Sequence, residues 1–184
     1  MPNRITLVGL INNKRIKDYV KCFGNELCKV PFGKVNFSRK DADTLPFHFT
    51  LSAWNISLKQ DVLGLLDRIC FNSLKISIND IKIMYGSENS YVLYFSIAEN
   101  NDLKKLLEEI YKILPTKKYN PNVFQFHITI HIDKDLSKIE YMKNKLLRHF
   151  IPFDIQIDEY GLFEIYPAKE IKRYSNKEKV KWNY

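Results

Sequence analysis

Two short stretches of the chain carry residue types that can perform acid–base chemistry. Residues 47–51 read Phe-His-Phe-Thr-Leu, and residues 126–130 read Phe-His-Ile-Thr-Ile. Their histidines are two of four in the chain and lie 79 residues apart. A histidine can give or take a proton near neutral pH, and a threonine hydroxyl can donate a hydrogen bond to an anionic oxygen. Two such pairs, brought together, would supply a general acid, a general base and two hydroxyls that stabilise developing charge.

Both stretches alternate apolar and polar residues, which is typical of half-buried β-strands because successive side chains point to opposite faces. We therefore predict that His48 and Thr50 share one face of a first strand. In the same way, His127 and Thr129 share one face of a second strand. The apolar residues between them form the opposite, core-facing side of each strand.

The same alternation places two further polar residues. Ser52 is expected on the His48 face, and His131 on the His127 face. Four strand residues span about 13 Å, which is too far for His127 and His131 to bind one metal ion together. We therefore expect His131 at the rim of the site or in solvent. His149 lies near the end of a predicted helix, where a positive charge suits the helix dipole, and is interpreted as structural.

The elements around the two strands are also repeated. A serine followed three residues later by Gln or Glu resembles a capping box, and this places helix N-caps at Ser57 and Ser137. Asn101 or Asp102 is expected to cap a further helix. The predicted elements are strands over about 5–11, 47–54, 74–85, 91–97, 123–132, 153–157, 162–166 and 171–174, and helices over about 14–27, 58–69, 103–114 and 139–150.

This duplication, over roughly 80 residues, predicts an α+β fold with two lobes. Each lobe is expected to derive from a strand-helix-strand-strand unit, with antiparallel sheets around a central cleft and helices on the outside. Residues 1–184 would form one domain with interleaved lobes. If the lobes face each other about a pseudo-twofold axis, the motifs at 48–50 and 127–129 converge on the cleft.

Composition narrows the class of partner. The 184 residues carry a formal net charge of +8, which favours an anionic partner such as a nucleotide or RNA. A bias toward lysine and asparagine in the genome would explain the charge equally well. The three cysteines lack the spacing of a disulfide framework or zinc site, and no apolar run reaches the length of a membrane span. We expect a cytoplasmic monomer that needs no protein partner.

Two basic, proline-containing segments precede the histidine strands, over 28–46 and 116–122. Loops of this kind are often functional, although a solvated surface loop is an equally good interpretation. Aromatic residues near the strands could stack on a base, although most aromatic residues are simply core. The candidates for steering a substrate are Arg39, Lys40, Lys117 and Lys118, and those for stacking are Phe32, Phe37, Trp54, Tyr119 and Tyr166.

The two His-x-Thr motifs, each flanked by apolar residues, resemble the two-histidine (2H) phosphoesterase superfamily. This group includes the RNA 2′,3′-cyclic phosphodiesterases, also called 2′-5′ RNA ligase-like proteins. Its pattern, apolar-x-His-x-Thr/Ser-apolar, occurs twice, and both copies fit here at His48/Thr50 and His127/Thr129. One such motif carries no signal, whereas two at this spacing on matched strand patterns are specific, and the paired topology extends the resemblance over nearly the whole chain.

The resemblance implies a bilobal fold and metal-independent chemistry without a cofactor. It implies that His48 and His127 are the catalytic acid and base, in an order that the sequence leaves open, and that Thr50 and Thr129 bind the phosphate. The expected substrate is a nucleotide or RNA phosphodiester, with a 2′,3′-cyclic phosphate first. The alternatives are a binding module without turnover, a metal-dependent hydrolase, and a superfamily enzyme acting on 2′-5′ linkages or cyclic signalling nucleotides.

Overall fold

The computed structural model describes residues 4–11, 16, 47–86, 89–115, 124–165 and 169–175, which form an antiparallel eight-stranded sheet with three α-helices. The predicted α+β fold with helices on the outside is thereby confirmed. The elements are β1 (Arg4–Leu10), β2 (His48–Asn55), a 3₁₀ turn (Ile56–Leu58), α2 (Lys59–Leu66), β3 (Leu74–Tyr85), β4 (Tyr91–Ile97), α3 (Asn101–Ile113), β5 (His127–Asp133), α4 (Leu136–Leu147), β6 (Phe153–Ile157), β7 (Glu159–Ile165) and β8 (Lys169–Ser175).

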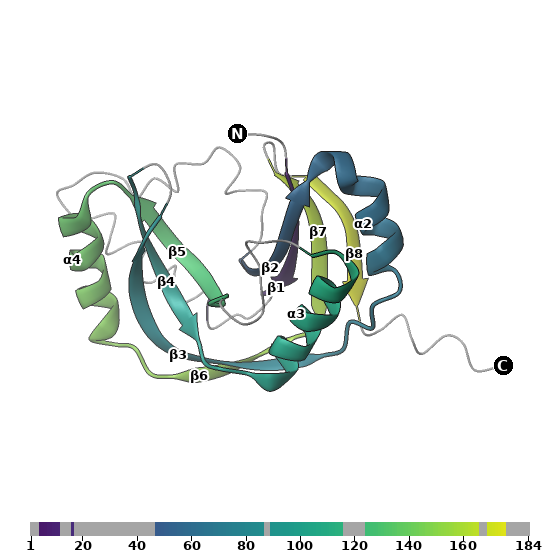
Figure 1. Ribbon diagram of the computed structural model, residues 1–184. Coiled ribbons are helices and arrows are strands. Elements are labelled where there is room, and N and C mark those ends of the chain that lie inside the picture. The colour runs from purple at the N-terminus through teal and green to yellow at the C-terminus, as the bar shows by residue number, and fades with distance from the viewer. Residues whose placement is uncertain are drawn as a thin grey trace.

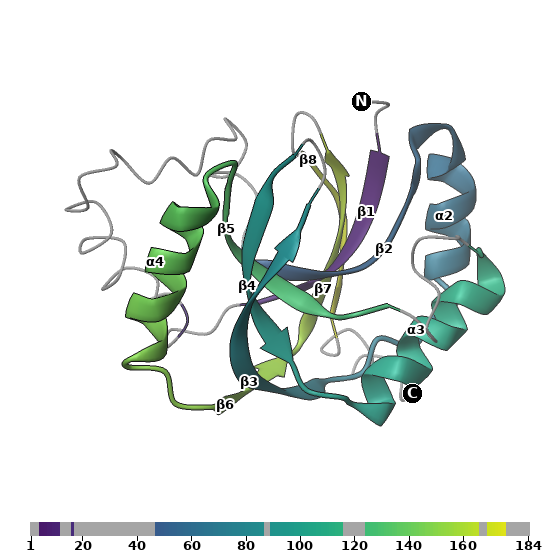
Figure 2. The same ribbon diagram turned by 60° about the vertical axis from the view of Figure 1, so that its left-hand side comes forward.

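The sheet has two halves that lean apart. The strand order is β6-β3-β4-β5-β2-β1-β7-β8, so β5 and β2 meet at its centre. Figure 1 shows α4 outside the half that contains β4 and β5, and α2 and α3 outside the half that contains β1, β2, β7 and β8. Figure 2 shows the same separation of α4 from α2 and α3 after rotation. Strands β3 and β6 lie along the bottom of Figure 1, and β3 continues upward beside β4, with which it pairs.

Strands from the two repeats pair with each other at two places. Strands β2 and β5 pair at Phe49 and Ile128, which we call the central pair. Strands β3 and β6 pair over five residues whose midpoint joins Ile76 and Ile155. Phe49 and Ile128 are 79 positions apart in the sequence, and so are Ile76 and Ile155. The two motif histidines have the same spacing. Antiparallel pairing of equivalent strands is the arrangement that a pseudo-twofold axis produces, as the duplication predicted.

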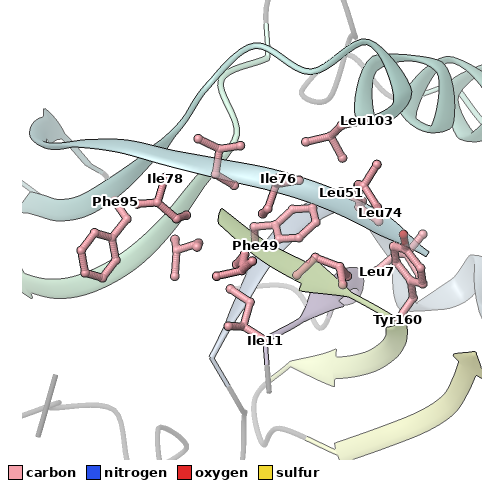
Figure 3. Packing of buried hydrophobic residues seen from close by; sticks show 14 of the residues in the cluster. Leu7, Ile11, Phe49, Leu51, Leu74, Ile76, Ile78, Phe95, Leu103 and Tyr160 are labelled. Carbon is pink, nitrogen blue, oxygen red and sulfur yellow. The ribbon is translucent and has the colours of Figure 1, made fainter. Parts of the chain in front are cut away.

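One face of the sheet packs against the helices and forms the main core. Both residues of the central pair are fully buried there, with Ile76 and Ile155 in the same cluster. Figure 3 shows Phe49 and Ile76 among the side chains of this cluster. Burial of large apolar side chains supplies most of the favourable free energy of folding, so the central pair is anchored from its core side. The helix residues in the cluster are Val62, Leu66, Leu103, Leu106, Ile110, Ile139, Met142 and Leu146.

The predicted strands and helices are confirmed within these residues, but the helix caps were placed one or two residues too late. Asn100 and Asp135 are the N-caps of α3 and α4, and Asn55 is the N-cap of the 3₁₀ turn that leads directly into α2, whose own N-cap, Leu58, makes no side-chain hydrogen bond. The asparagines and the aspartate are extended, and their side-chain oxygens accept hydrogen bonds from backbone N–H groups of the first turn. Ser57 and Ser137 instead donate their backbone N–H groups to Asn55 and Asp135. Asn and Asp cap at least as well as Ser, so the earlier residues prevail. The predicted helix over 14–27 lies outside the described residues apart from Ile16.

Gly9 makes room for one member of the central pair. It lies across from Phe49 on β1, and a Cβ atom at Gly9 would come within 2.3 Å of the Phe49 ring. That ring is fully buried, so it cannot move into solvent. The missing side chain of Gly9 therefore sets the position of the Phe49 ring, and with it the strand that carries His48 and Thr50.

We predict that Gly9→Ala lowers the free energy of unfolding by about 1–3 kcal/mol, because the added methyl group overpacks the core. The matched control is Gly64→Ala in α2, where an added Cβ meets no atom within 4 Å. That exchange should raise the free energy of unfolding by about 0.5–1 kcal/mol through helix propensity alone. Urea unfolding of both variants tests this, and a Gly9→Ala protein as stable as the parent would contradict it.

Candidate active site

The register of β2 and β5 brings the two His-x-Thr motifs together on one face of the sheet. The antiparallel register of the central pair, continued by one residue in each direction, puts His48 across from Thr129 and His127 across from Thr50. Side chains on either side of a buried pair point to the opposite face, so all four project away from the core. In this register the two histidines are diagonal neighbours across the two strands. We call this surface the site face.

All four motif side chains are partly exposed, whereas the residues that separate them are buried. His48, Thr50, His127 and Thr129 have intermediate exposure, and both members of the central pair have none. The burial pattern from the histidine onward is the same in the first six residues of β2 and β5. Each motif therefore combines a solvent-accessible pair of polar groups with a rigid apolar backing, as the alternation predicted.

Gln125 and Tyr94 both contact the His127 ring. Its Nδ1 atom lies 3.0 Å from the backbone oxygen of Gln125, and because a carbonyl can only accept, Nδ1 must carry a proton. The ring also makes an edge-to-face contact with Tyr94 of β4, with centroids 5.3 Å apart and planes at 67°. A hydrogen bond at one ring nitrogen selects the tautomer and leaves the chemistry of the ring to the other nitrogen.

The His48 backbone is fixed by β1. Leu10 lies across from His48, and the N–H of Ile11 donates to the oxygen of Phe47 at 2.8 Å. Leu10 and Val8, which lies across from Thr50, belong to a small apolar cluster with Phe163 that is separate from the main core. The surroundings of the first motif on β1 are thus apolar.

Both histidine strands contain a β-bulge directly after the motif. The pairing of β2 with β1 skips Leu51, and the pairing of β5 with β4 skips Ile130. A bulge inserts one residue and resets the alternation of side chains. The prediction that Ser52 shares the His48 face is therefore wrong, because Ser52 lies across from core residue Leu7 and is 1% exposed.

The prediction that His131 lies at the rim or in solvent is wrong for the same reason. His131 lies across from the buried Leu93 and is 2% exposed. Its Nε2 atom is 3.5 Å from the Asp133 carboxylate, which also binds the Lys138 ammonium of α4. The bulge carries this histidine to the core side, where it packs between β5 and α4 instead of projecting from the site face.

Burial and charge set the protonation states of this buried cluster. Desolvation by burial lowers the pKa of His131, against the opposing influence of Asp133, so the ring is neutral near pH 7. Burial of Asp133 acts in the opposite direction to its hydrogen bonds from Lys138 and the Asp135 N–H. These hydrogen bonds prevail and lower the pKa of Asp133 to about 2. The cluster consists of a neutral imidazole beside a stable ion pair.

Other candidates from the sequence have structural positions or lie outside the described residues. Trp54 is a core residue, 5% exposed, whose Nε1–H donates to the Leu114 oxygen at 3.3 Å, so it does not stack on a base. His149 is exposed directly after α4, as expected. The loop candidates that lie outside the described residues are Phe32, Phe37, Arg39, Lys40, Lys117, Lys118, Tyr119 and Tyr166.

Two further searches cover only the described part of the chain. In residues 4–11, 16, 47–86, 89–115, 124–165 and 169–175, no three His, Cys, Asp or Glu side chains are grouped as metal ligands. Within the same ranges, no helix has the length and apolar character needed to cross a membrane.

The fold is shared with solved phosphoesterase structures. E. coli LigT in its apo form aligns with a TM-score of 0.61 and 14% identity, over 95% of this chain and 98% of LigT. A structure described as a phosphoesterase aligns with a TM-score of 0.58 and 13% identity, over 95% and 98% of the two chains. Usb1 from Kluyveromyces marxianus aligns with a TM-score of 0.56 and 11% identity, over 91% and 96%. No family model and no curated protein sequence matches the chain.

These alignments define the class of fold to which the chain belongs. It is the fold of LigT and Usb1, and the alignments extend over almost the whole of the chain and of these structural neighbours. The fold agrees with the resemblance to 2H phosphoesterases that the two His-x-Thr motifs carry.

The buried histidine generates a pH prediction. The pKa of His131 is lowered in the folded protein from its ordinary value of 6.5. At a pH below about 6.5, His131 therefore binds a proton more readily in the unfolded chain than in the folded protein. Stability should therefore fall as the pH drops below about 6.5, with a slope of up to about 1.4 kcal/mol per pH unit from this group. The contribution of Asp133 to stability is lost only when the pH falls from 3.8 toward about 2. The pH ranges in which His131 and Asp133 affect stability are therefore separate.

Urea unfolding at pH 7.5 and 5.0 measures this effect. We expect His131→Gln to have a smaller loss of stability between the two pH values than the parent protein. His149→Gln, which replaces an exposed histidine, should retain the parent's pH dependence. An unchanged pH dependence in His131→Gln would show that His131 does not resist protonation.

Proposed function

We propose that this chain is a metal-independent phosphodiesterase that acts on a nucleotide or RNA phosphodiester, with a 2′,3′-cyclic phosphate as its substrate. His48 and His127 are its general acid and base, and Thr50 and Thr129 bind the phosphate. The observation that carries this proposal is the register at the central pair, which brings both His-x-Thr motifs onto the site face.

The fold of the neighbours supports the proposed class of substrate. LigT has been solved in complex with 3′-AMP and with phosphate, and Usb1 with uridine monophosphate. These ligands are nucleotides or the phosphate group itself. We infer that the site face of this chain receives a phosphate group of the same kind, between the two histidines.

The proposed reaction needs only groups present on the site face. One histidine removes a proton from water, and the water oxygen attacks phosphorus. The bond between phosphorus and one ribose oxygen breaks, and the other histidine, initially protonated, gives its proton to that oxygen. The two threonine hydroxyls donate hydrogen bonds to the non-bridging oxygens as negative charge increases on them. A proton exchanged with solvent between the histidines completes the cycle.

The register at the central pair supports this scheme. It puts each histidine across from the threonine of the other motif, so both motifs would contact a phosphate group bound between them. The apolar backing by the central pair restricts strand movement. Positioning of this kind is a large part of catalysis in phosphoryl transfer.

We predict that His48→Ala and His127→Ala each lower kcat/KM by about 10²–10⁴-fold, because each removes one partner in proton transfer. Both side chains are partly exposed, so the variants should fold normally by circular dichroism. Thr50→Ala and Thr129→Ala should each lower kcat by about 10²–10³-fold through loss of a phosphate hydrogen bond. His149→Ala is the matched control and should retain full activity.

The assay uses purified protein with EDTA against 2′,3′-cyclic nucleotides, 2′-5′ oligonucleotides and cyclic dinucleotides, and identifies the phosphate isomer formed. Full activity in both histidine variants would refute the assignment, and loss of activity with EDTA would indicate a metal-dependent hydrolase. RNA binding that weakens steeply with salt, without any product, would indicate a binding module.

A further inference from the structure

A buried tyrosine lies on the site face beside one of the two histidines. Tyr94 of β4 lies across from Thr129, so its side chain projects from the same face as both residues of the second motif. It is 6% exposed and belongs to neither apolar cluster. Its neighbours in β4, Leu93 and Phe95, point to the main core.

The ring of Tyr94 meets the ring of His127. The centroids are 5.3 Å apart and the planes meet at 67°, the edge-to-face geometry that aromatic pairs prefer. The Nδ1–H of His127 donates to the Gln125 oxygen on the same strand. The imidazole is thus held at one nitrogen by backbone and along the ring by a side chain from a neighbouring strand.

The two halves of the sheet differ at this position. In the other half, Val8 lies across from Thr50, just as Tyr94 lies across from Thr129. The bulges of the two strands occur at equivalent places, so Val8 and Tyr94 are equivalent residues. The position that holds the aromatic residue Tyr94 beside the second motif thus holds the aliphatic residue Val8 beside the first.

The protonation state of Tyr94 is constant over the range in which histidines titrate. Burial, and secondarily the charge of Asp80, raise the pKa of the phenol above its ordinary value of 10. Any change in the pH profile between pH 5 and 9 after substitution of Tyr94 would therefore come from other groups.

We propose that Tyr94 is a positioning residue that fixes the orientation of His127, so that Nε2 transfers the proton while Nδ1 remains bonded to Gln125. This inference rests on the proposed function of His127, and it assigns to Tyr94 the role of orienting the His127 ring. The ring of Tyr94, not its hydroxyl, performs this role.

The test compares two substitutions of Tyr94. Tyr94→Phe keeps the ring and should retain kcat within about twofold. Tyr94→Leu removes the ring and should lower kcat by about 10–100-fold, with KM within about threefold, because a small displacement of a catalytic group has effects of this size. The matched control is Tyr91→Leu, which removes another tyrosine of β4 whose edge-to-face contact is with Tyr85 instead of a histidine. That control should retain full activity.

A double-mutant cycle separates positioning from general stability. If Tyr94 acts through His127, Tyr94→Leu costs nothing further in a His127→Ala background. The loss from Tyr94→Leu should instead persist undiminished in a His48→Ala background, wherever residual turnover is measurable. If Tyr94→Leu lowers kcat by the same factor in the His127→Ala background as in the parent, the proposal for Tyr94 is overturned. The proposed role of His127 would be unaffected by that result.

A spectroscopic measurement tests the inference without activity. Nitrogen-15 NMR of the imidazoles should show neutral His127 as the Nδ1–H tautomer in the parent and in Tyr94→Phe. Tyr94→Leu should give a mixture of tautomers or a shifted titration of His127, while His149 is unchanged. An unaltered His127 spectrum in folded Tyr94→Leu would refute positioning, whereas full activity of His127→Ala would refute the proposed function itself.

Discussion

The pairing of Phe49 with Ile128 is the constraint on which the rest of the structure depends. It joins the two halves of the sheet, and it is the position at which the two histidine strands pair. A slip by one residue would turn every side chain of a strand to the opposite face. The full burial of both residues, and the space that Gly9 leaves for the Phe49 ring, make such a slip unfavourable. The same contacts that build the core therefore align the polar groups on its other side.

Each histidine strand has to serve a site and a core within a few residues. The bulges at Leu51 and Ile130 resolve this conflict, because they end the alternation immediately after the threonine. The next residues, Ser52 and His131, then turn toward the interior. In the second strand this buries an imidazole, which the helix α4 accommodates through the Asp133–Lys138 ion pair. The polar cluster behind β5 is a consequence of this change of direction.

Much of this arrangement could be predicted from residue patterns. Strict alternation identified the faces of the four motif residues, and the repeated helices and strands identified the duplication. The bulges could not be predicted, because an inserted residue depends on pairing with β1 and β4, which the order of apolar and polar residues does not record; hence the errors at Ser52 and His131. Neither could the contact of Tyr94 with His127, since it joins strands whose register is set by tertiary packing. The helix caps at Asn55 and Asp135 could have been recognised, because Asn and Asp are strong capping residues.

The interleaving of the two repeats has a consequence for how the chain acquires its structure during synthesis. The half of the sheet that carries His48 contains β1, β2, β7 and β8, so its strand β1 pairs with β7 more than 150 residues later in the sequence. A nascent chain that has exposed only the first repeat cannot complete this half. Non-local pairing of this kind slows folding, because the ends of long loops must meet before the contacts form. The two histidines therefore become neighbours only after most of the polypeptide has been made, and a truncated product would lack an ordered site.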